Sequence, residues 1–167
     1  KCNIPVLCVG NVTLGGAGKT PTVIEIRKFL SNSFEKIFVL TRGYKGNIKG
    51  PLIVSKDHSF HDVGEESMLH AQFGLTCVSK NKFLGAKFCE AHGGKLIIMD
   101  DGLQSKDIKK NCKLLVIDGN YGFGNKKIFP SGPLREPIKS CIKNSDLILI
   151  IGKKSNVYNC DIIPKHK

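Results

Sequence analysis

The sequence predicts an α/β domain, with a mostly parallel β-sheet flanked by helices in a three-layer core. Short runs rich in Val, Ile and Leu recur along the 167 residues, and amphipathic stretches of helical length lie between several of them. The runs are apolar on both faces, as expected of parallel strands that helices cover. A chain of this length can also bury a core of its own.

Each element is expected where the periodicity places it. We expect six strands at the apolar runs, over residues 4–9, 36–40, 75–79, 95–99, 113–117 and 146–151. We expect three helices, over residues 19–31, 65–73 and 81–92. Residues 118–137 are rich in Gly and Pro and show no clear period, and a loop of that length in a compact domain is usually functional or mobile.

The amino-acid composition indicates which classes of binding partner to expect. A formal net charge of +12 favours phosphates, nucleic acid or an anionic membrane surface. The sequence has no Trp, no zinc-finger spacing and no arginine-rich tail, so we expect no nucleic-acid partner. Seven scattered cysteines without a C-x-x-C pair predict reduced thiols in a cytosolic setting.

The stretch VGNVTLGGAGKTP, residues 9–21, predicts a nucleotide site. An apolar strand ends at Gly10, a glycine-rich turn follows, and a helix begins near Lys19, which is the context that a phosphate-binding loop requires. Lys19 would reach the β- and γ-phosphates, and the Thr20 hydroxyl would bind Mg²⁺. The residues expected to bind nucleotide are Thr13, Leu14, Gly15, Gly16, Ala17, Gly18, Lys19 and Thr20.

This loop departs from the common G-x-x-x-x-G-K-[ST] pattern, because Thr13 stands at its first glycine. The segment GGAGKT instead fits a variant loop that also occurs in partitioning ATPases and some small-molecule kinases. The dimerising ATPases of that branch carry Lys just before the paired glycines. Leu14 at that position counts against them.

Acidic residues follow the strand at 95–99. Asp100 and Asp101 stand where phosphate-loop enzymes place a carboxylate that supports Mg²⁺. Adjacent side chains on a strand point to opposite faces, so we expect a twist into Gly102 if both are to reach the cleft. A turn or capping role for one of them is the alternative.

Other candidates lie at loop and helix ends. Glu65 and Glu66 begin a predicted helix, where either the helix dipole or a general-base role explains them. Arg135 and Glu136 lie between prolines, where they would either face phosphate and Mg²⁺ or pair with each other. Arg42 follows the second strand, where it would contact a substrate phosphate.

Together, these motifs resemble one family, the tetraacyldisaccharide 4'-kinases. Five segments of this sequence are similar to the family's motifs and occur in the same order. They are GNVTLGGAGKTP, TRGYKG, DVGEES, DDGLQS and the glycine- and proline-rich GFGN…FPSGPLREP. The resemblance covers nearly the whole chain, from residue 4 to about residue 152, and implies a phosphate-loop NTPase-like core. We expect residues 1–152 to form this kinase core and residues 153–167 to be a polar tail or the start of a second lobe.

The resemblance implies a reaction and its participants. ATP with Mg²⁺ would phosphorylate the 4'-hydroxyl of a tetraacylated disaccharide 1-phosphate, a lipid A precursor, at the cytoplasmic face of a bacterial inner membrane. The expected partners are this lipid and the anionic membrane surface. The family has an N-terminal membrane helix and a second lobe, and we expect this sequence to be a fragment without them.

The resemblance also implies roles. The catalytic residues are expected to be Lys19, Glu65, Asp101 and Arg135. Mg²⁺ is expected to contact Thr20, Asp100, Asp101 and Glu136, and the substrate to contact Arg42, Glu66 and Gln104.

Two alternatives remain. The first alternative is a pseudoenzyme that only binds nucleotide, because Glu65 replaces the family's proposed aspartate base. A partitioning or regulatory ATPase of the variant-loop class is the other.

Overall fold

The fold is built on one sheet, in which β1 lies between β5 and β6. The computed structural model describes residues 2–152, and its sheet has seven strands in the order β3-β4-β2-β5-β1-β6-β7. All neighbouring pairs are parallel except β3 and β4. The strands are β1 (Val6–Gly10), β2 (Ile37–Thr41), β3 (Leu52–Ile53), β4 (Thr76–Val78), β5 (Leu96–Asp100), β6 (Cys112–Asp118) and β7 (Leu147–Ile151).

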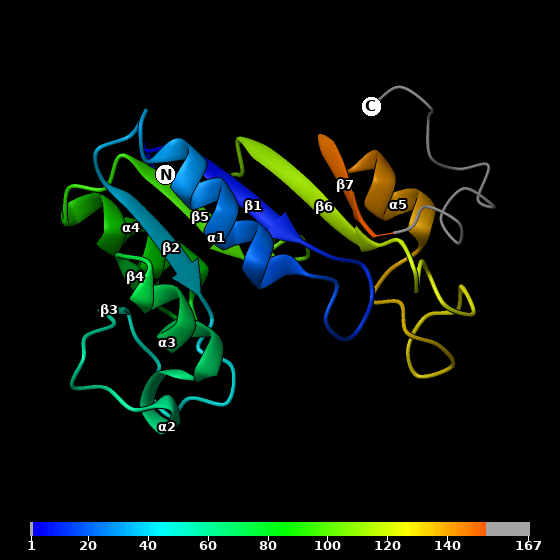
Figure 1. Ribbon diagram of the computed structural model, residues 1–167, viewed down its shortest axis with the longest axis horizontal. Helices are drawn as coiled ribbons and strands as arrows, with labels where there is room; N and C mark the ends of the chain where they lie inside the picture. The colour runs from blue at the N-terminus through cyan, green and yellow to red at the C-terminus, as the bar shows by residue number, and fades with distance from the viewer. Residues whose placement is uncertain (1, 153–167) are drawn as a thin grey trace.

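Helices cover both faces of this sheet (Figure 1). One face carries α1 and α3, and the other carries α4 and α5, while the short α2 precedes α3. The helices are α1 (Lys19–Leu30), α2 (Phe60–Val63), α3 (Glu65–Gln72), α4 (Lys82–Ala91) and α5 (Ile138–Lys143).

The core follows the strand alternation. In β5, Ile98 packs with Val23 of α1 on one face, whereas Ile97 and Met99 pack with Cys89 of α4 on the other. Both faces of the central sheet are therefore buried from solvent. This explains why the central strands read as continuous apolar runs in the sequence.

The predicted fold class is confirmed. All six expected strands and three expected helices are present, with ends that differ by one or two residues. Residues 119–137 form turns and isolated bridges, as the missing periodicity indicated. β3, α2 and α5 were not predicted, because two, four and six residues are too few to show a period in the sequence.

Residues 2–152 contain no helix that is long and apolar enough to cross a bilayer. The predicted tail, residues 153–167, lies outside the described residues.

A buried arginine fixes α3 against the sheet. Arg27 of α1 is only 7% exposed. Its guanidinium donates to the carbonyls of His70, Ile37 and Leu75, at 3.5, 3.3 and 3.2 Å. Gly74 makes room for it, since a side chain there would collide with the guanidinium. One cation thus joins α1, the end of α3 and β2.

Replacing this cation should destabilise the fold. We expect Arg27→Met to lower the free energy of unfolding by about 2 to 4 kcal/mol, because buried carbonyls lose a charged donor. Urea denaturation measures the change. Lys28→Met, which removes an exposed side chain of the same helix, is the matched control and should cost less than about 0.5 kcal/mol. Equal effects of the two variants would contradict the anchoring role.

Candidate active site

The carboxyl ends of the parallel strands meet at one cleft of about 1070 Å³. Its walls are the loop before α1, the ends of β2 and β5, and the start of α3. Ligands of open α/β sheets bind at this edge of the sheet, because loops from several strands converge there.

The phosphate loop is shaped for anions. Gly15 and Gly18 have φ angles of 107° and 81°, which favour glycine. No atom lies within 4 Å of the position that a Cβ would take at Gly15 or Gly16, so the backbone there is open. The first turn of α1 contains no acidic residue and its start has no side-chain cap, which leaves its N–H groups available to a phosphate.

One asparagine holds this loop together. Asn11 is fully buried, and its Nδ2 donates to the carbonyls of Thr13 and Gly15, at 2.8 and 3.2 Å. Its Oδ1 accepts from Lys19 Nζ at 3.1 Å. Hydrogen bonds within the protein therefore hold the loop, and Lys19 rests on a neutral partner that a phosphate can replace.

The structure explains why Thr13 replaces the usual glycine. Thr13 forms an antiparallel bridge with Leu134. On either side, Leu14 N donates to Pro133 O at 2.7 Å and Arg135 N donates to Val12 O at 2.8 Å. The glycine- and proline-rich loop is thus pinned along the phosphate loop. An extended residue suits this pairing, so glycine is not required.

The two aspartates at the end of β5 both reach the cleft. Asp101 has a φ of 53°, which produces the twist that the sequence analysis required. Arg135 Nη1 binds both oxygens of Asp101, at 2.9 and 3.0 Å. Asp100 is 3% exposed, and its Oδ1 has no hydrogen-bond partner within residues 2–152. Of the two carboxylates, Asp100 is therefore the one with an oxygen that no group in residues 2–152 hydrogen-bonds.

The segments TRGYKG and DVGEES pack against each other. Gly64 has a φ of 84° at the junction of α2 and α3, and a side chain there would collide with the Tyr44 carbonyl. Glu66 lines the cleft, whereas Glu65, one residue earlier, does not, and both residues remain partly exposed to solvent. Burial and then the nearby Asp100 carboxylate raise the pKa of Glu66.

A buried lysine lies beneath the cleft. Lys82 of α4 is 5% exposed and lines the cleft, and its Nζ donates to the carbonyls of Leu40 and Asp100, both at 3.2 Å. Burial lowers the pKa of Lys82 to about 8, and the Asp100 carboxylate opposes this shift. Lys82 thus joins the ends of β2 and β5 and adds a second lysine to the cleft that Lys19 lines.

Most predicted site residues lie in this cleft. The lining residues include Leu14, Gly15, Gly16, Gly18, Lys19, Thr20, Arg42, Glu66, Asp100, Asp101, Gln104 and Arg135. Thr13 and Ala17 are buried and do not line it.

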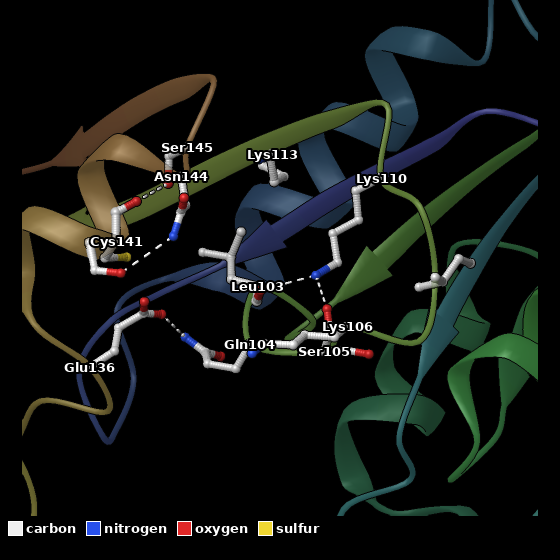
Figure 2. A pocket seen from close by; sticks show the side chains of 12 residues that line it. Leu103, Gln104, Ser105, Lys106, Lys110, Lys113, Glu136, Cys141, Asn144 and Ser145 are labelled. Atoms are coloured by element: carbon white, nitrogen blue, oxygen red, sulfur yellow. Dashed lines mark hydrogen bonds between the residues drawn. The ribbon is translucent and has the colours of Figure 1, made fainter.

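Glu136 lies elsewhere, in a second cavity of about 560 Å³ against α5. There its Oε1 accepts from Gln104 Nε2 at 3.0 Å (Figure 2).

Asn11, His70 and Lys82 were missed by the sequence analysis. Asn11 directly follows β1, and this position beside a glycine-rich loop was the available signal. Lys82 and His70 sit in amphipathic helices, where a polar residue resembles a solvated one.

Known proteins resemble the chain over nearly its full length. The family described as tetraacyldisaccharide-1-P 4'-kinase matches residues 1–165. The tetraacyldisaccharide 4'-kinase of Dinoroseobacter shibae is 43% identical over 150 residues, which are 89% of this chain and 44% of that protein. The protein of that name from Bradyrhizobium sp. (strain ORS 278) is 42% identical over 154 residues, 92% of this chain and 46% of that one. The chain thus spans about half the length of the curated relatives it matches.

A solved structure is also similar. The crystal structure of LpxK from Aquifex aeolicus in complex with ATP matches with a TM-score of 0.80 and 25% sequence identity. The match covers 99% of this chain and 52% of that chain.

Proposed function

The chain belongs to the tetraacyldisaccharide-1-P 4'-kinase family, and we propose that it forms the phosphate-binding part of an enzyme that phosphorylates a tetraacyldisaccharide 1-phosphate with ATP. One observation carries this proposal: a glycine-rich phosphate loop, two aspartates and Glu66 at the start of α3 all line one cleft. These are the groups that transfer of a phosphoryl group to a hydroxyl requires. The acceptor is the 4'-hydroxyl of the disaccharide.

We assign the loop and Lys19 to the triphosphate. The N–H groups at the start of α1 would bind phosphate oxygens, and Lys19 would exchange Asn11 Oδ1 for the γ-phosphate. Arg135, which is held by the loop and by Asp101, would add a second cation as negative charge develops on the transferring group. Arg42 and Lys82 also line the cleft.

The residues present fit a magnesium ion. Asp100 Oδ1 is buried without a partner inside the described chain, which is costly unless a cation binds it. Thr20 and Asp100 would hold the ion, with Asp101 close by. Bound Mg²⁺ would neutralise charge on the β- and γ-phosphates. Glu136, in the second cavity, is not needed for this assignment.

Glu65 is our proposed base, and Glu66 our proposed inner carboxylate. The hydroxyl oxygen would attack the γ-phosphorus, the bond to the β-phosphate oxygen would break, and ADP would leave. The hydroxyl proton would pass to Glu65, an exposed residue that directly precedes the cleft-lining Glu66. Glu66 lies nearer Asp100 and would help to order the metal site.

We further propose that the acceptor is presented at the cytoplasmic face of an inner membrane. The net charge of +12 supports this placement, since anionic headgroups attract basic surfaces.

The proposal predicts lipid phosphorylation that depends on Lys19. With ³²P-labelled ATP and tetraacyldisaccharide 1-phosphate in mixed micelles, we expect label in the lipid. Lys19→Met should lower the rate at least about 100-fold, because it removes a charge that stabilises the transition state. Lys28→Met, on the exposed side of the same helix, should retain full activity. ATP hydrolysis without labelled lipid would instead support a regulatory ATPase.

Substitutions of Glu65 and Glu66 should affect different kinetic parameters. Glu65→Gln should lower kcat about 100-fold or more while the affinity for ATP stays within about 3-fold, as expected for a lost base. Glu66→Gln should chiefly weaken binding of ATP with Mg²⁺. Glu35→Gln, at an exposed acid remote from the cleft, controls for charge. A kcat loss for Glu66→Gln alone would transfer the base role to that residue.

A further inference from the structure

A buried histidine contacts the aspartate with the available oxygen. His70 Nε2 lies 2.8 Å from Asp100 Oδ2, and the two side chains are 1% and 3% exposed. Asp100 follows Leu96 and Ile98 on the face of β5 that α1 and α3 cover, so α3 meets this carboxylate from that face. The contact joins residues 30 positions apart in the chain.

The two oxygens of Asp100 have different surroundings. Oδ2 is held by His70, whereas Oδ1 is buried and no group in residues 2–152 hydrogen-bonds to it. A buried carboxylate oxygen without a partner costs free energy, and such atoms in native proteins call for an explanation. Because Asp100 lines the phosphate cleft, a cation that arrives with the nucleotide supplies one.

The helix that carries His70 is fixed at three points. Arg27 binds the His70 carbonyl, the Ser67 and Thr41 hydroxyls are 2.6 Å apart, and His70 itself holds Asp100. The donor therefore has little freedom to move relative to β2 and β5. An interaction that fixes one carboxylate oxygen leaves the other with a set direction.

We propose that His70 is a positioning residue, which holds Asp100 Oδ2 so that Oδ1 is presented to the magnesium ion of the bound nucleotide. This inference rests on the proposed function, since it takes the cleft to bind ATP with Mg²⁺. It adds a residue outside the phosphate loop and the aspartate pair. It also gives α3 a second role beside carrying Glu65 and Glu66.

The test is the magnesium dependence of ATP binding. Isothermal titration calorimetry would give the ATP affinity in excess Mg²⁺ and in EDTA, and their ratio is the magnesium gain. We expect His70→Leu to reduce this gain about 10-fold or more and to leave the affinity in EDTA within about 2-fold. His70→Gln, which can still donate from a side-chain nitrogen, should keep most of the gain. His92→Leu, at an exposed histidine of the C-terminal end of α4, is the control.

The outcomes separate the inference from the function on which it rests. An undiminished gain in His70→Leu, or an equal loss in Mg²⁺ and in EDTA, would overturn the positioning role alone. If the unaltered chain shows no magnesium gain, both the proposed metal site and this inference fail. If His70→Leu does not fold, His70→Asn replaces it, because that side chain is polar but too short to reach Asp100. It too should lose the gain, and a full gain would overturn the proposal.

Discussion

The parallel pairing of β1 with β5 is the contact on which the rest of the site depends. Its register sets Val9 opposite Asp100, so the strand that leads into the phosphate loop ends beside the strand that ends in two aspartates. β2 follows on the other side of β5 and brings in the TRGYKG segment, against which the start of α3 packs. A shift of one residue in this register would turn Asp100 to the opposite face of the sheet, away from α3 and His70.

Contacts within the protein hold the walls of the cleft in place. Asn11 and the bridge between Thr13 and Leu134 hold the loop, and Arg135 pairs with Asp101 across it. Basic and acidic groups both line the cleft, and Asp100 Oδ1 has no hydrogen-bond partner within residues 2–152, so a triphosphate and its metal would complete this charge pattern.

Features that depend on residues close together in the chain could be predicted from the sequence. Apolar runs located the six longer strands, and the strand, glycine-rich turn and helix around Lys19 located the phosphate loop. Contacts between segments that are far apart in the chain could not be predicted in this way. Nothing near His70 indicates that it meets Asp100, and Lys82 resembles an ordinary helix lysine although it is buried beneath the cleft. Glu136 shows the converse, since its place in a motif gave no sign that it lies in a separate cavity.

The central claim is that this cleft binds the triphosphate of ATP through Lys19 and its metal through Asp100. A crystal structure of the chain with Mg²⁺ and a non-hydrolysable ATP analogue tests it most directly. The account predicts phosphates along residues 15–20, Lys19 Nζ on the γ-phosphate instead of Asn11 Oδ1, and Asp100 Oδ1 facing Mg²⁺ directly or through a water molecule. A triphosphate bound elsewhere, with Lys19 still on Asn11 and Asp100 Oδ1 away from the metal, would contradict it.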